Sequence, residues 1–324
     1  MGRPPLRAFA IVLALATNAL AGAAMAQDYP TRPVRLIVPY GAGGASDVMA
    51  RYLGQKLGEV LGQSVVVENL PGAAGTTAYI AVAKSAPDGY TVGYATSSLA
   101  INSVLKPKVG YDPIRDFVPV SNFVEIQNVL IVPASSPAKT VGELVAMAKQ
   151  KPGALNYVSL GPGSTPHLSA ELFLAAAGAK AQQVPYKQTT QAYTDLIEDR
   201  VQFWIASMPS TLPHVRSGKV RALAVASTKR SPAYPDVPTF IESGIQAEST
   251  FWQGLFVPAG TPPAIAAKLN AAVRKVVELP DAKAFYGKLG AELSPSTQDE
   301  LAATLRKEID KWAKISKDVG LATQ

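Results

Sequence analysis

The chain has 324 residues with 48% hydrophobic and 17% charged side chains, which is typical of globular proteins and excludes disordered and membrane-embedded chains. Its formal net charge is +7, but the basic residues are scattered, so we expect no nucleic-acid partner. Cysteine is absent and histidine occurs twice, so disulfides are excluded and we expect neither a cofactor nor a histidine- or thiolate-ligated metal, although an oxygen-ligated ion stays open.

The first 26 residues have the pattern of a secretory signal. Arg3 and Arg7 precede an apolar run, and small residues end the segment at Ala26. We therefore predict export with cleavage near Ala26. A membrane anchor is the alternative, but the apolar run is shorter than the roughly 20 residues that span a bilayer. The remaining chain has the size at which one core usually divides into two domains.

Strand and helix signals alternate in the first part of the mature chain. We predict strands at 33–40, 64–69 and 90–96, and helices at 46–62 and 78–86. Ser46 is the predicted N-cap of the first helix. This alternation is typical of a parallel sheet that is covered by helices on both faces.

The rest of the chain repeats this α/β plan and ends in helices. Strands are predicted at 129–133, 154–160, 182–186, 201–206, 219–227 and 251–260, and helices at 140–150, 166–178, 189–198, 210–218 and from 262 onward, with a last helix over 298–319. Thr140 and Glu143 are spaced as a capping box. The proline-rich residues 229–244 are predicted to be irregular.

Four loops at predicted strand ends are candidates for a binding site. They are residues 40–47, 71–77, 96–98 and 159–167. In parallel α/β sheets, ligands bind beyond the carboxyl ends of the strands, where each loop leads into a helix. Free backbone amides and the positive end of a helix dipole suit an anion there. None of the loops contains Lys or Arg, so backbone amides and hydroxyl groups would hold that anion.

Other interpretations of the loops are weaker. The segment GAGGAS is not a dinucleotide-binding GxGxxG, because Ser46 occupies the last glycine position. Ser159, Ser164 and His167 suggest a hydrolase, but no GxSxG nucleophile elbow occurs in the sequence. A serine and a histidine three residues apart at a helix start are better suited to capping and to ligand hydrogen bonds.

Several segments resemble one protein family. They are YPTRPVRLIVPYGAGGASDVMAR, VVVENLPGAAG, APDGYTV, YDPIRDFVPVS, VPYK, GKVRALAVAST with YPDVPTFIESG, and FVPAGTP. In this order, they are similar to the Bug or TctC family, the periplasmic solute-binding receptors of tripartite tricarboxylate transporters. The resemblance covers the mature chain and implies a type II periplasmic-binding-protein fold, with two α/β domains, a ligand cleft between them and two crossing hinge strands. It implies domain I at 27–127 and 252–324 and domain II at 128–251.

The resemblance implies a binding protein and no enzymatic activity. Such a receptor would capture a carboxylate by hinge closure in the periplasm, as a monomer, and deliver it to the large and small integral-membrane subunits of the transporter. Two alternatives stay open. The receptor could serve a sensor kinase, or the protein could be an exported hydrolase, for which only His167 and His214 are available as histidine bases.

The resemblance also implies the binding residues. The loop that begins at Tyr40 would hold one carboxylate, and the segment SLGPGSTPHL of the second domain would hold the other. The complete predicted set is Tyr40, Gly41, Ala42, Gly43, Gly44, Ser46, Asp47, Gly75, Thr76, Thr96, Ser97, Ser98, Ser159, Gly161, Gly163, Ser164, Thr165, His167, Tyr186, Trp204, Ala206 and Ser207.

One predicted strand departs from the family pattern. The family often reads QVDFMFDS where this chain reads RVQFWIAS, so that Ala206 replaces an aspartate. An amino-acid ligand needs a partner for its ammonium group, and an aspartate is the natural one. Ala206 therefore predicts a non-amino dicarboxylate, aliphatic or aromatic. Phe203 and Trp204 face opposite ways along this strand, and the sequence leaves open which of them faces the ligand.

Overall fold

The computed structural model describes residues 29–106, 108–161 and 164–318. The strands are β1 (Val34–Val38), β2 (Val65–Asn69), β3 (Thr91–Thr96), β4 (Phe117–Pro133), β5 (Asn156–Ser159), β6 (Gln182–Pro185), β7 (Trp204–Ser207), β8 (Val220–Val225), β9 (Thr250–Pro258) and β10 (Ala291–Leu293). The helices are α2 (Ala45–Leu61), α3 (Thr76–Ala83), α4 (Ser98–Leu105), α5 (Val141–Gln150), α6 (Thr165–Ala177), α7 (Thr189–Ile197), α8 (Met208–Arg216), α9 (Pro263–Glu278), α10 (Pro280–Lys288) and α11 (Gln298–Asp318), with a 3-10 turn η1 (Ala73–Gly75).

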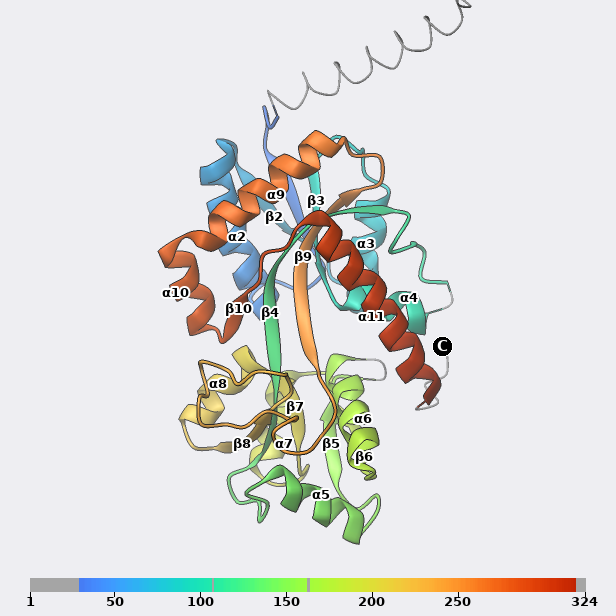
Figure 1. The fold of residues 1–324 in the computed structure, drawn as a ribbon, viewed down its shortest axis with the longest axis vertical. Helices are drawn as coiled ribbons and strands as arrows, with labels where there is room; N and C mark the ends of the chain where they lie inside the picture. The colour runs from blue at the N-terminus through green and yellow to red at the C-terminus, as the bar shows by residue number, and fades with distance from the viewer. Residues whose placement is uncertain (1–28, 107, 162–163, 319–324) are drawn as a thin grey trace, which may run out of the picture.

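The first domain is built on a sheet with the strand order β10-β4-β9-β3-β1-β2. Strand β1 pairs in parallel with β2 and β3, whereas β9 runs antiparallel to β3 and β4. The parallel sheet predicted from the alternating segments is therefore confirmed for β1, β2 and β3, and the returning strands β9 and β10 add antiparallel pairs to it. Helices α2, α9 and α10 cover one face of this sheet and α3, α4 and α11 the other, as Figure 1 shows.

The second domain adds its strands to the far end of β4. Strands β7 and β8 pair antiparallel with β4, and β5 pairs in parallel with β6. A bridge between Tyr157 and Phe203 connects the two sets. Two buried clusters lie on opposite faces of these strands, with Leu130 and Phe203 in one and Val129 and Trp204 in the other.

Strands β4 and β9 run side by side from one domain to the other and form the ribbon that joins them (Figure 1). Their pairing extends from Phe117 opposite Pro258 to Gln127 opposite Thr250. This ribbon matches the two crossing strands that the family resemblance implies. The predicted domain boundaries, after residues 127 and 251, lie beside the end of the pairing and stay predictions.

Local signals predicted some element ends correctly and others not. The capping box of α5 is present, with Thr140 Oγ1 accepting from the Glu143 amide at 3.2 Å. The N-cap of α2 is Gly44 and not Ser46, because the helix begins at Ala45. Strand β10 and helix α4 were not predicted. Residues 229–244 are irregular apart from isolated bridges, as predicted.

The predicted signal segment lies outside the described residues. Within those residues, no helix combines the length and the hydropathy that a membrane span requires.

Candidate functional site

A cavity of about 420 Å³ lies between the two domains, on one face of the β4–β9 ribbon. We call it the front cavity. It is lined by Tyr40, Ala45, Ser46, Thr96, Ser98, Ile126, Asn128, Leu160, Thr165, Pro166, Thr189, Trp204, Ala206, Ser207, Ser210, Phe251 and Gln253.

Helix N-termini surround the front cavity. Among the described residues, α2, α4, α6, α7 and α8 each place a first-turn residue in its lining, namely Ser46, Ser98, Thr165, Thr189 and Ser210. The first amides of a helix have no partner within the helix, and the helix dipole adds positive potential at that end. None of the lining residues is charged. The lining therefore favours an anion through backbone amides and hydroxyl groups.

Hydroxyl groups cover the first-domain wall of the cavity. The Tyr40 hydroxyl lies 2.9 Å from Thr96 Oγ1 and 3.2 Å from Ser98 Oγ. Behind them, the Tyr79 hydroxyl lies 2.7 Å from Ser98 Oγ. Burial raises the pKa of Tyr79 far above its ordinary value, and the neighbouring Tyr40 adds to this effect. The Tyr79 hydroxyl thus stays protonated, and the network remains a set of neutral hydrogen-bonding groups.

Asp47 is buried at the start of α2 and is occupied by local contacts. Its carboxylate accepts hydrogen bonds from the Gly43 amide and from Asn69 Nδ2, both at 2.8 Å, and pairs with Arg51 at 2.9 Å. Burial raises the pKa of Asp47, but the hydrogen bonds from Arg51, Gly43 and Asn69 outweigh burial and hold this pKa below its ordinary value. Asp47 therefore stabilises the loop and helix start, and it does not line the cavity.

The second-domain wall combines hydroxyl groups with one aromatic side chain. Ser207 Oγ and the Tyr193 hydroxyl each donate to Ser210 Oγ at 3.1 Å. Trp204 and Ala206 lie two residues apart on the same face of β7, and both line the cavity. Phe203 packs into the core on the opposite face. Trp204 is thus the residue of the pair that lines the cavity.

Two glycines shape the loops beside the cavity. Gly43 has φ +82° and Gly161 has φ +104°, a left-handed region in which other residues are strained. A Cβ atom on either glycine would meet no atom within 4 Å. Both positions therefore require glycine for their backbone conformation, while the space beside them stays open.

Eight of the predicted binding residues line the front cavity: Tyr40, Ser46, Thr96, Ser98, Thr165, Trp204, Ala206 and Ser207. The structure does not bring the others into the described lining. These are Gly41, Ala42, Gly43, Gly44, Asp47, Gly75, Thr76, Ser97, Ser159, Gly161, Ser164, His167 and Tyr186, while Gly163 lies outside the described residues.

The predicted residues that do not line the cavity have structural contacts. His167 is buried with its ring 6.4 Å from that of Tyr157, and burial lowers the pKa of His167. Ser159 is fully buried and its Oγ accepts from the Gly161 amide at 3.2 Å. The Tyr186 hydroxyl donates to Asp195 at 2.9 Å.

Several lining residues were missed by the sequence reasoning. They are Ala45, Ile126, Asn128, Leu160, Pro166, Thr189, Ser210, Phe251 and Gln253. Pro166, Thr189 and Ser210 could have been found, because they occupy the first turns of predicted helices, and Ala45 because it lies in the candidate loop 40–47. In the part of the chain that the structure describes, no group of three or more His, Asp or Glu side chains could hold a metal ion.

Comparisons with known proteins agree with the fold. The model of the family described as the tripartite tricarboxylate transporter family receptor, TctC, matches residues 49–321. Protein BugT of Bordetella pertussis is 36% identical over 309 residues, which cover 94% of this chain and 95% of BugT.

Two solved structures share the fold at substantial identity. R. palustris Rpa4515 with adipate is 36% identical with a TM-score of 0.82, and the match covers 91% of this chain and 99% of that chain. MatC from Rhodopseudomonas palustris with bound malate is 33% identical with a TM-score of 0.78, over 89% and 99% of the two chains. The two-domain fold predicted from the quoted segments is thereby confirmed. The chain belongs to the TctC family of tripartite tricarboxylate transporter receptors, which are periplasmic solute-binding proteins and not enzymes.

Proposed function

We propose that the protein binds a non-amino dicarboxylate in the front cavity and delivers it to the membrane subunits of a tripartite tricarboxylate transporter. The observation that supports this most is the set of helix N-termini and hydroxyl groups around a lining without charged side chains. Each carboxylate would accept hydrogen bonds from backbone amides and hydroxyls, as anions do at helix N-termini. The solved relatives with adipate and malate support the same ligand class.

The two walls of the cavity suit a ligand with a carboxylate at each end. Tyr40 and Ser98 lie on the first domain, and Thr165 and Ser207 lie on the second. Between these walls the lining includes four apolar side chains from the ribbon and the second domain, namely Ile126, Leu160, Trp204 and Phe251, beside the amides Asn128 and Gln253 of the ribbon. We propose that the alkyl chain or ring of the ligand contacts these apolar side chains.

An amino-acid ligand fits this lining less well. A buried ammonium group without a partner costs several kcal/mol. Ala206 offers no carboxylate where aspartate is common in the family, and Asp47 is occupied by Arg51, Asn69 and the Gly43 amide. We therefore propose a ligand without an ammonium group.

Binding would proceed by closure of the domains about the β4–β9 ribbon. A ligand held by one wall completes its hydrogen bonds only when the other wall approaches. Its affinity for the closed form would thus shift the population toward closure, and the closed form would be presented to the membrane subunits. We propose that the receptor acts as a monomer.

A ligand panel tests the proposed ligand class. We expect a non-amino dicarboxylate to give the largest rise in melting temperature among terephthalate, phthalate, adipate, succinate, malate, citrate, benzoate, nicotinate, aspartate and glutamate. At 100 times its dissociation constant, a ligand adds about 2.7 kcal/mol of stability, which raises the melting temperature by several degrees.

Thr165→Ala should then weaken the affinity measured by calorimetry by about 1 to 3 kcal/mol, the scale of a hydrogen bond to a charged group. Thr194→Ala is the control, since Thr194 is exposed on α7 and does not line the cavity. In the ligand panel, the largest rise in melting temperature with aspartate or glutamate would contradict the proposed ligand class.

The proposed location has its own test. The signal pattern of residues 1–26 leads us to propose a mature chain that begins next to Gln27 in the periplasm. N-terminal sequencing of the protein from a periplasmic extract should show this start. An intact Met1 on the native protein would refute cleavage.

A further inference from the structure

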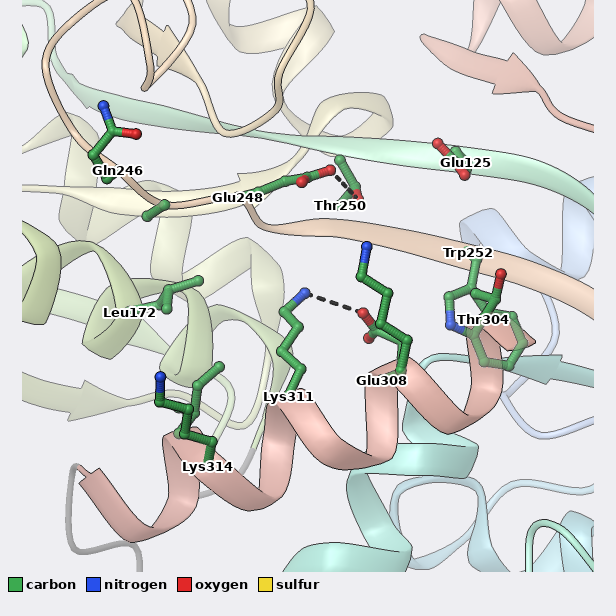
Figure 2. A pocket seen from close by; sticks show the side chains of 13 residues that line it. Glu125, Leu172, Gln246, Glu248, Thr250, Trp252, Thr304, Glu308, Lys311 and Lys314 are labelled. Carbon is green, nitrogen blue, oxygen red and sulfur yellow. Dashed lines mark hydrogen bonds and ion pairs between the residues drawn. The ribbon is translucent and has the colours of Figure 1, made fainter. Parts of the chain in front are cut away.

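A second cavity, of about 630 Å³, lies on the opposite face of the β4–β9 ribbon. We call it the rear cavity. Figure 2 shows its walls, with Glu125 and Trp252 on the ribbon, Glu248 and Leu172 on the second-domain side, and Lys311 on α11. The proposed function makes no use of this cavity.

The ribbon separates the two cavities by the alternation of its side chains. Ile126 is paired with Phe251, and both line the front cavity. The next pair, Glu125 with Trp252, lines the rear cavity. Successive residues of a strand point to opposite faces, so the same two strands form a wall of each cavity.

The rear cavity also spans both domains. Helix α11 is fixed to the first domain by Leu301 and Leu305, which are buried in the cluster that holds Phe256 of the sheet. Leu172 and Glu248 on the opposite wall come from the second domain. The end of α11 also contacts the second domain, because Trp312 and Ile315 share a buried cluster with Leu168 of α6. Because the ribbon lies between the cavities, a bend that narrows the front cavity would pull α11 away from Leu168 and Glu248 and would widen the rear cavity.

Opposite charges face each other across the rear cavity. Three lysines and one glutamate line it from α11, namely Lys307, Lys311, Lys314 and Glu308, while Glu248 lines it from the second domain and Glu125 from the ribbon. Lys311 pairs with Glu308 of its own helix at 3.1 Å, and Glu248 accepts from Thr250 Oγ1 at 3.3 Å. Within the described residues, no ion pair joins an α11 lysine to Glu248. The attraction across the open space therefore favours a narrower rear cavity.

We infer that the rear cavity controls the ligand affinity of the front cavity, through Thr304, Lys311 and Lys314 of α11 and Glu248 opposite them. These are positioning residues, since they act on the ribbon and not on the ligand. Attraction across the rear cavity favours a wide front cavity and lowers affinity. A bulky group that keeps the rear cavity wide favours the closed front cavity and raises affinity. The inference rests on the proposed function only where adipate affinity is measured. The distance measurement in ligand-free protein does not depend on it.

The first test places a wedge in the rear cavity. Thr304 is half-buried and lines it, so Thr304→Trp should hold α11 away from the opposite wall. We expect adipate to bind about 3- to 10-fold more tightly, the usual range of a modest coupling between sites. Ala303→Trp is the matched control, because Ala303 is exposed on the same helix and does not line the cavity. It should leave the affinity unchanged.

The second test removes the attraction without adding bulk. Glu248→Gln should raise adipate affinity about twofold at low ionic strength. It should also make this affinity less dependent on salt concentration, because salt screens the attraction between charges that are separated by solvent. Glu278→Gln, at an exposed position of α9, is the control and should do neither.

A ligand-free readout separates this inference from the proposed function. The chain has no cysteine, so Gln55→Cys on α2 and Thr194→Cys on α7 give two specific spin labels, on helices that begin at opposite walls of the front cavity. In ligand-free protein, Thr304→Trp should shift the distance distribution between the labels toward shorter values, and Ala303→Trp should not. Unchanged distances in Thr304→Trp would overturn the inference whether or not adipate binds. Shorter distances without adipate binding would support it and would count against the proposed ligand.

Discussion

Ala206→Asp is expected to reduce the affinity for a dicarboxylate by about 100-fold or more at neutral pH. Ala206 is 1% exposed and lines the front cavity, and none of the described lining side chains is a cation. A carboxylate at this position would face the carboxylates of the ligand, and like charges in contact cost several kcal/mol. The same substitution would supply the partner that an ammonium group needs, so aspartate and glutamate should bind relatively better.

Calorimetry on three proteins measures this effect. Ala206→Asn has nearly the shape of Ala206→Asp without its charge, so it should lose less affinity. Burial should raise the pKa of the introduced aspartate. The loss relative to the native protein should therefore shrink as the pH falls and this carboxyl group is protonated. Equal affinity of the Asp and Asn variants at every pH would show that the ligand does not lie beside Ala206.

Trp204→Ala is expected to lower the free energy of unfolding by about 3 to 5 kcal/mol, the range for large buried aromatic side chains. Trp204 is 1% exposed, and its ring lies 4.7 Å from that of Tyr193. Trp204→Phe should cost less than Trp204→Ala, because phenylalanine keeps an aromatic ring at this position and leaves a smaller cavity. The indole Nε1 of Trp204 also has no hydrogen-bond partner among the described residues. Replacing the indole therefore leaves no acceptor without its donor.

Denaturant unfolding measures both variants, and Trp312 provides a matched control. Trp312 is also 1% exposed, but its Nε1 donates to Glu308 at 2.8 Å. Trp312→Phe should therefore cost more than Trp204→Phe, since the Glu308 carboxylate loses a donor. If Trp204→Phe were as costly as Trp204→Ala, the Trp204 indole N–H would have a stabilising role that its contacts do not show.

The order of strands and helices could largely be predicted because it depends on local patterns. Apolar periodicity and turn residues identify β1, α2 and β2 without knowledge of their neighbours. The extent of β4 could not be predicted, since only residues 129–133 have a continuous apolar pattern, whereas Pro119, Ser121 and Asn122 interrupt its first half. Pairing with β9 extends the strand through these residues, and that pairing joins segments more than 120 residues apart.

The lining residues of the candidate site likewise include some that local sequence patterns could predict and others that they could not. Thr165 and Ser98 could be found because loops at strand ends that lead into helices are recognisable in a sequence. Asn128, Phe251 and Gln253 could not, since they lie within paired strands and not in the loops at strand ends. Strand periodicity sets Phe203 and Trp204 on opposite faces, but only the packing of α6 against one face and α8 against the other decides that Trp204 faces the cavity.

The position of β9 has a consequence for how the chain folds during synthesis. In the first sheet, β9 lies between β3 and β4, so the strands made first cannot join β4 until residue 258 has been made. Helices α9 and α11, which bury the two faces of that sheet, come later still. Such long-range pairing forms slowly, because distant segments must meet before any contact stabilises them. A growing chain therefore has no finished first domain until β9 and the helices that follow it have been made, whereas the strands and helices of the second domain are complete earlier.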